Sequence, residues 1–172
     1  MGVDSVMNLF ILRHGIAVEP GTPGYQDSER PLIPKGRRQL NKIADAMRAM
    51  KLSFDVILSS PLVRARQTAE IVAADLKAKK RLAFADELKP GGDVKKLVQK
   101  INTLKPRPEN IILVGHEPSL SWLISLFITG ETDAGIVLKK SGLAKLETDK
   151  LRAGRCAALA WLLTPAQMKR MD

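Results

Sequence analysis

Residues 7–15 read MNLFILRHG, a short apolar run that ends in an arginine, a histidine and a glycine. The run is too short and too continuously apolar for an amphipathic helix, so it predicts a buried strand over Met7–Leu12. A second run of this kind, Asn110–Val114, is followed by Gly115 and His116. The chain of 172 residues has only two histidines, and each follows a predicted strand. Because ligands of open α/β sheets bind beyond the carboxyl ends of the strands, both imidazoles are expected at one site.

Outward from these two runs, strand-like and helix-like segments alternate. One helical pattern begins at Lys35, and another begins at Ser60-Pro61 and ends in the basic run Lys77–Arg81. Two further helical patterns cover Asp93–Leu104 and Ser119–Ile128. Further strands are predicted over Asp55–Ser59, Leu82–Phe84, Gly142–Glu147 and Ala157–Leu163. This alternation predicts an α/β fold, a three-layer αβα sandwich with a mostly parallel central sheet and helices on both faces. The last two strands are successive and favour a hairpin at one edge.

Length and composition limit the class of protein. A chain of 172 residues with 45% hydrophobic content can bury one core, which predicts a single domain over residues 7–164 after an N-terminal extension, 1–6. The formal charge of +10 favours anionic partners, but 4% aromatic residues argue against nucleic acid. No apolar run is long enough to span a bilayer. One cysteine and no signal-peptide pattern make the cytoplasm the expected location, and a monomer is favoured.

Charged side chains follow three of the predicted strands: Arg13 with His14, then Arg64, then His116. A phosphoryl group suits this set, because the planar fork of arginine matches two phosphate oxygens and needs no metal. Arginine keeps its proton in proteins, so a histidine must react, and neutral imidazole is a good nucleophile. The second histidine would then stabilise the transition state. Spacing alone does not separate Arg64 from Arg66.

Three motifs in this order resemble the histidine phosphatase superfamily, which has the phosphoglycerate-mutase-like fold. They are Leu12-Arg13-His14-Gly15, the segment Ser59–Ala69, and Leu113-Val114-Gly115-His116. Within that superfamily, three further segments are similar to the SixA-type phosphohistidine phosphatases: Arg30-Pro31-Leu32 with Lys35-Gly36, Glu87–Asp93, and Gly115-His116-Glu117-Pro118.

The resemblance implies a role for each matching residue. His14 would be the nucleophile, Arg13 and Arg64 would clamp the phosphoryl group, and His116 would be the second catalytic histidine; the match also selects Arg64 over Arg66. Glu87 lies where many members carry the acid that protonates the leaving group. A phosphohistidine leaves as imidazole and needs less help, so Glu87 is either that proton donor or an ordinary loop carboxylate.

The long loop over residues 18–34 contains four prolines and two glycines, and a loop of that length in a compact domain is either disordered or functional. Its Arg30 either lines the pocket as a substrate contact or is a solvated charge. Gly15, beside the nucleophile, is a second candidate for substrate binding.

The leading hypothesis is a metal-independent phosphatase without cofactor that dephosphorylates histidine on a signalling or phosphotransfer protein through a covalent phosphohistidine. The alternative is a phosphatase of small phosphomonoesters with the same mechanism, which would favour a working Glu87 and a loop that folds over the site. A non-catalytic phospho-binding module is less favoured, because a binder could keep the arginines without the nucleophile.

Overall fold

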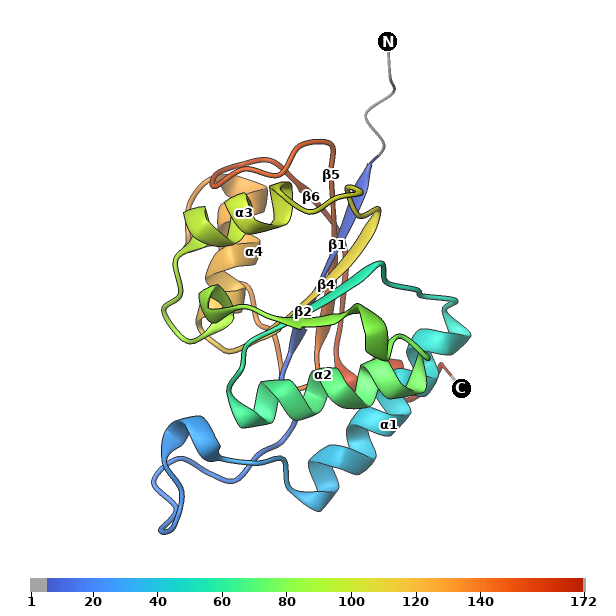
Figure 1. Cartoon of the computed structure of the whole chain (residues 1–172), viewed down its shortest axis with the longest axis vertical. Helices are drawn as coiled ribbons and strands as arrows, with labels where there is room; N and C mark the ends of the chain where they lie inside the picture. Colours follow the sequence, from blue (N-terminus) through green and yellow to red (C-terminus); the bar gives the residue numbers. More distant parts are fainter. Residues whose placement is uncertain (1–5, 172) are drawn as a thin grey trace.

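The computed structural model describes residues 6–171, and residues 1–5 of the predicted N-terminal extension lie outside the described part. A six-stranded sheet lies between two layers of helices (Figure 1). The strands are β1 (Met7–Arg13), β2 (Val56–Ser59), β3 (Leu82–Phe84), β4 (Asn110–Gly115), β5 (Leu143–Thr148) and β6 (Ala158–Leu163). The helices are α1 (Pro34–Ala49), α2 (Val63–Asp75), α3 (Val94–Asn102), α4 (Ser119–Thr129) and α5 (Pro165–Met168). The predicted α/β sandwich is confirmed.

The strand order β3-β2-β4-β1-β5-β6 places the most apolar strands, β4 and β1, at the centre of the sheet. The pairs β1–β4, β2–β4 and β2–β3 are parallel, whereas β5 runs antiparallel to β1 and β6 antiparallel to β5. The predicted hairpin is therefore present at one edge. Arg13 pairs with Gly115 and Ser59 with Val114, so three neighbouring strands end at the same level.

Both faces of the sheet are buried, which is why its central strands contain runs of consecutive apolar residues, Leu9–Leu12 in β1 and Ile111–Val114 in β4, rather than apolar residues at alternate positions. In β1, Leu9 and Ile11 belong to the core under α3 and α4, and Phe10 and Leu12 belong to the core under α1 and α2. Side chains of a strand alternate between faces, so one short run supplies both cores. The sheet is thereby held from both sides, and its carboxyl edge is a rigid base for reactive side chains.

Two predicted boundaries of α2 are wrong. The helix begins at Val63 rather than at Ser60-Pro61, because the hydroxyl of Ser60 accepts the N–H of Leu62 and forms a turn before the helix. The helix ends at Asp75, and Lys77 has a left-handed φ of 55°, so the basic run does not close it. Those residues form a separate turn, Lys79–Arg81.

Beyond the last predicted strand, the chain forms α5, whose Met168 is fully buried in the core under α1 and α2. The single domain over residues 7–164 stays a prediction, and packing against the core continues to Met168. Among the helices within residues 6–171, none combines the length and the apolar character that a membrane span needs.

Candidate active site

The carboxyl ends of β1, β4 and β2 bring the two histidines together. The N–H of His14 donates to the carbonyl of Gly115 at 3.1 Å, and the N–H of Ser60 donates to the carbonyl of Val114 at 2.9 Å. The ring centroids of His14 and His116 lie 5.2 Å apart. The convergence of the two imidazoles expected from the sequence is present in the structure.

His14 has a defined tautomer. Its Nδ1 lies 2.8 Å from the carbonyl oxygen of Gly15, and because a carbonyl can only accept, Nδ1 carries the proton. The lone pair is then on Nε2. Burial lowers the pKa of His14 to about 3, and the charges of His116, Arg64 and Arg13 add to that effect. At pH 7 the ring is neutral, which a nucleophile requires.

His116 is buried, and it is held through Nε2, whereas His14 is held through Nδ1. Its Nε2 lies 2.8 Å from the hydroxyl of Ser60, while its buried Nδ1 has no hydrogen-bond partner among the described residues. Burial lowers its pKa to about 4, and the positive charge of Arg64 is the next largest cause. The free Nδ1 belongs to a neutral ring.

Both predicted arginines lie at the site, and the Nε of each is buried without a hydrogen-bond partner among the described residues. Arg13 donates from Nη1 to the carbonyl of Leu138 at 3.0 Å, and Arg64 donates from Nη1 to the carbonyl of Asp27 at 2.7 Å. Arg66 instead points to Glu70, 3.8 Å away, and its side chain is 46% exposed. The structure thus separates Arg64 from Arg66, as the resemblance did.

The backbone around His14 is fixed from two sides. The N–H of Gly15 donates to Thr68 Oγ1 at 3.0 Å, and that hydroxyl donates to the carbonyl of Arg64 at 2.7 Å. The N–H of Ser141 is shared between the carbonyls of Arg13 and His14, at 3.1 and 3.2 Å. The amide and carbonyl of Gly15 both have protein partners that hold the backbone beside His14, and its contact with substrate stays a prediction.

Arg30 is buried and faces its own loop. It donates from Nε and Nη2 to Asp27 Oδ1, at 3.0 and 2.8 Å, and from Nη1 to the carbonyl of Val18 at 2.5 Å. Its charge contributes to the lowered pKa of both His116 and Arg64, so it lies near the site. The side chain is therefore not the solvated loop charge that was one alternative.

The sequence analysis did not name two residues that bond to predicted site residues: Asp27, which bonds to Arg64, and Ser60, which bonds to His116. The hydrogen bond from Arg30 holds the pKa of Asp27 below its usual range, so the carboxyl is ionised at the mouth of the site. The only sequence signal for Asp27 is its place three residues before Arg30 in the long loop. Ser60 stood out only as a helix start.

Glu87 is paired with a lysine rather than with the two histidines. It belongs to the turn Asp86–Leu88, and Lys100 Nζ of α3 lies 2.7 Å from its Oε2. The ion pair with Lys100 lowers the pKa of Glu87, which favours the ionised form over a proton donor. Within residues 6–171 it makes no hydrogen bond or ion pair with His14 or His116. Nor do three His, Cys, Asp or Glu side chains of that range gather where they could hold a metal ion.

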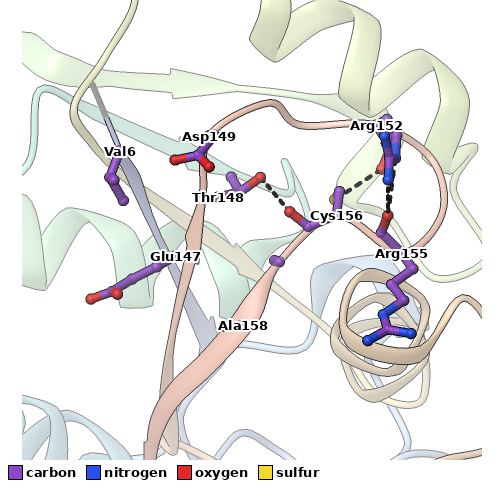
Figure 2. Close-up of a pocket in the computed structure, with 9 residues that line it drawn as sticks. Val6, Glu147, Thr148, Asp149, Arg152, Arg155, Cys156 and Ala158 are labelled. Carbon is purple, nitrogen blue, oxygen red and sulfur yellow. Dashed lines mark hydrogen bonds between the residues drawn. The ribbon is translucent and has the colours of Figure 1, made fainter. Parts of the chain in front are cut away.

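A surface pocket at the opposite end of the sheet is a different feature (Figure 2). It is lined by Val6 before β1 and by residues at the end of β5 and the start of β6. The guanidinium of Arg152 there donates to the carbonyl of Arg155, and Thr148 donates to the carbonyl of Cys156 at 2.7 Å. These polar groups hold the connection between the two strands, far from both histidines.

Comparison with known proteins identifies a family and several relatives of this chain. The family model described as histidine phosphatase superfamily (branch 1) matches residues 9–89. An uncharacterised protein of Picosynechococcus sp. is 34% identical over 147 residues, 85% of this chain and 88% of that protein. The phosphohistidine phosphatase SixA of Escherichia coli K12 is 27% identical over 164 residues, 95% of this chain and 97% of the relative. A solved structure of the protein histidine phosphatase SixA complexed with tungstate gives a TM-score of 0.80 at 27% identity, covering 93% of this chain and 98% of that one.

Proposed function

Since the chain belongs to the histidine phosphatase superfamily and is a phosphatase, we propose that it hydrolyses phosphohistidine on a signalling or phosphotransfer protein. The observation that carries the proposal is a neutral His14 beside three buried nitrogens without partners: Arg13 Nε, Arg64 Nε and His116 Nδ1. Buried polar groups are normally paired, so three free ones at one place indicate a site for a missing acceptor. The oxygens of a phosphoryl group are such acceptors.

In the first step, Nε2 of His14 attacks phosphorus and the bond from phosphorus to the substrate nitrogen breaks. The other ring nitrogen of the substrate carries a proton taken from solvent, so the ring keeps the electron pair of that bond and leaves as neutral imidazole. Arg13, Arg64 and His116 hold the equatorial oxygens, whose charge is greatest in the transition state. The product of this step is phosphohistidine at position 14.

In the second step, water attacks the phosphorus of that intermediate and loses a proton. The bond between phosphorus and Nε2 breaks, its electron pair returns to His14, and inorganic phosphate leaves. Two phosphoryl transfers thus replace one direct hydrolysis. His14 is a good nucleophile in the first and a good leaving group in the second.

The leaving group decides between protein phosphohistidine and small phosphomonoesters. An alkoxide needs a proton donor in the site, whereas a phosphohistidine ring that solvent has protonated on its other nitrogen leaves as neutral imidazole, a much weaker base. Glu87 is ion-paired with Lys100, which favours the substrate that needs no acid. The SixA relative carries phosphohistidine phosphatase in its name, and the SixA structure holds tungstate, an oxyanion of similar shape to phosphate.

Rapid-quench mass spectrometry with a phosphorylated histidine phosphotransfer domain tests the proposal. We expect one phosphoryl group on His14 of the wild-type protein and none in His14→Ala. Arg64→Ala and His116→Ala should each lower kcat by about 10²- to 10³-fold, because each removes one preorganised donor. EDTA should leave the rate unchanged. A wild-type protein that is never labelled and never turns over would refute the covalent mechanism.

A second comparison addresses the substrate. Turnover of the phosphorylated domain is measured beside a panel of small phosphomonoesters. Preference for the panel, together with a large loss of activity in Glu87→Gln, would replace protein phosphohistidine by the alternative substrate class.

A further inference from the structure

The guanidinium of Arg64 makes hydrogen bonds along one of its edges only. A guanidinium offers donors along two edges, one with both Nη atoms and one with Nε and a single Nη. Asp27 takes the first edge: its carbonyl accepts from Nη1 at 2.7 Å and its Oδ2 accepts from Nη2 at 3.2 Å. Nε on the second edge is buried and free. One residue of the 18–34 loop thus fixes Arg64 while its second edge stays available.

The same carboxylate joins two arginines of like charge. Oδ1 of Asp27 accepts from Arg30 and Oδ2 accepts from Arg64. The side chains of these arginines are 9% and 4% exposed, whereas that of Asp27 is 62% exposed. Buried charges need a partner of opposite charge. Without Asp27, the positive charges of the two guanidinium groups would repel each other with no carboxylate between them. In Figure 1 this part of the loop lies beside the N-terminal end of α2, which carries Arg64.

A blocking role for Asp27 does not fit these contacts. A carboxylate that occupied the phosphoryl position would accept hydrogen bonds from the N–H groups that we propose bind the phosphoryl oxygens. Instead Arg13 Nε, Arg64 Nε and His116 Nδ1 all remain free within the described residues. Asp27 accepts from the two Nη atoms of Arg64 and leaves its Nε free, so binding of an oxyanion at Nε does not require Asp27 to be displaced.

We propose that Asp27 is a positioning residue that holds Arg64 in the orientation in which its Nε edge binds the transferring phosphoryl group. The inference rests on the proposed function and adds to it a residue that touches no substrate atom. Misplacement of a catalytic group by about 1 Å can lower a rate about 10²-fold, so orientation alone has a large effect. Because the carboxylate acts through Arg64, its loss should impair the transition state more than the bound substrate.

The test compares Asp27→Asn with Glu29→Gln, a charge removal in the same turn at an exposed residue. Asp27→Asn keeps the carbonyl that binds Arg64 and a similar shape. We expect its kcat to fall about 10- to 100-fold with KM changed less than threefold, while Glu29→Gln stays near wild type. Asp27→Glu keeps the charge but displaces it, and should also lose kcat. Equal kcat in Asp27→Asn and Glu29→Gln, or a rise in kcat, would overturn the inference.

A double-variant cycle separates positioning from a general structural effect. In an Arg64→Ala background, Asp27→Asn should cause no further loss of kcat, because residues that act as a unit are not additive. Losses that multiply would show that Asp27 acts elsewhere. Thermal unfolding of each variant confirms that it is folded, and Asp27→Glu takes the place of Asp27→Asn if the latter is not.

Vanadate binding, measured by calorimetry, needs no turnover. It distinguishes a failure of the proposed function from a failure of the positioning role of Asp27. Vanadate imitates the transition state and inorganic phosphate the ground state. Asp27→Asn should weaken vanadate binding at least tenfold more than phosphate binding. A wild-type protein that binds neither anion refutes the proposed function. A wild-type protein that binds and turns over, with an Asp27→Asn variant of unchanged selectivity, refutes only the role of Asp27.

Discussion

We expect Ser60 to determine which nitrogen of His116 carries the proton. The hydroxyl oxygen of Ser60 accepts the N–H of Leu62 at 3.3 Å, so its own hydrogen is free to point at Nε2 of His116, 2.8 Å away. A ring that accepts at Nε2 is protonated at Nδ1 while it is neutral. Nδ1 is the buried atom without a partner. The serine therefore turns that atom into a donor for a phosphoryl oxygen.

Ser60→Ala is expected to lower kcat about tenfold at pH 7, less than the loss of about 10²-fold or more from removing His116 itself. Without the serine, neutral His116 is free to place its proton on Nε2 and present a lone pair to the phosphoryl group. Below pH 4 the ring is protonated on both nitrogens, because its pKa is lowered to about 4, so the defect should shrink toward that pH. Steady-state rates across pH measure both effects.

Ser59→Ala is the matched control, because that buried hydroxyl donates to the carbonyl of Ser60 and does not contact His116. Full activity of Ser60→Ala at pH 7 would show that the tautomer is set in another way.

At the residue scale, placement after strands was enough to predict His14, His116 and Arg13. Arg64 was selected over Arg66 by the family resemblance, and only the structure shows the reason. Asp27 and Ser60 act through hydrogen bonds across 37 and 56 residues of sequence. Such contacts depend on how the loop and α2 meet in space, which no local pattern encodes.

At the scale of elements, α1 contacts the chain just after the nucleophile without any side chain between them. A Cβ on Gly36 would lie 2.1 Å from the carbonyl oxygen of Ile16, far inside contact distance. The same oxygen accepts the N–H of Ile33 at 3.0 Å, just before the helix. Only glycine allows this approach, which sets the distance between α1 and the end of β1.

Gly36→Ala should therefore destabilise the protein by about 1–3 kcal/mol, as overpacking does. The sign of the change in unfolding free energy is informative, because glycine to alanine at an exposed position inside a helix stabilises by about 1 kcal/mol. Urea unfolding followed by tryptophan fluorescence measures the difference, with Lys35→Ala on the exposed side of the same turn as the control. A variant as stable as wild type would show that Ile16 moves away at no cost.

Element boundaries were predicted where periodicity is strong and missed where backbone conformation decides. The strands agree with their predicted ranges to within a residue at either end. The start of α2 was wrong because a serine-proline pair also suits the turn that precedes a helix. Its end was wrong because Lys77 takes a positive φ. The four residues of α5 are too few to show a period.

At the scale of the whole molecule, the buried histidines link stability to pH. Burial lowers the pKa of His14 to about 3 and that of His116 to about 4, from an ordinary value of 6.5. Between those values and 6.5 the unfolded chain binds protons that the folded chain does not. Stability then rises with pH across this window and is lost as the pH falls from about 6.5 toward 4.

Calorimetric unfolding from pH 7.5 to 4.5 measures this dependence in wild type and in the double variant His14→Gln with His116→Gln. The chain has no other histidine, so any slope that remains in the double variant above pH 5 comes from other groups, chiefly carboxylates. We expect the Tm of wild type to fall more steeply than that of the double variant between pH 6.5 and 5. Parallel curves would show that both imidazoles keep ordinary pKa values in the folded protein, and a His14 with an ordinary pKa would be half protonated at pH 6.5, which would lower the fraction able to attack. The stability profile therefore tests the neutral nucleophile independently of any substrate.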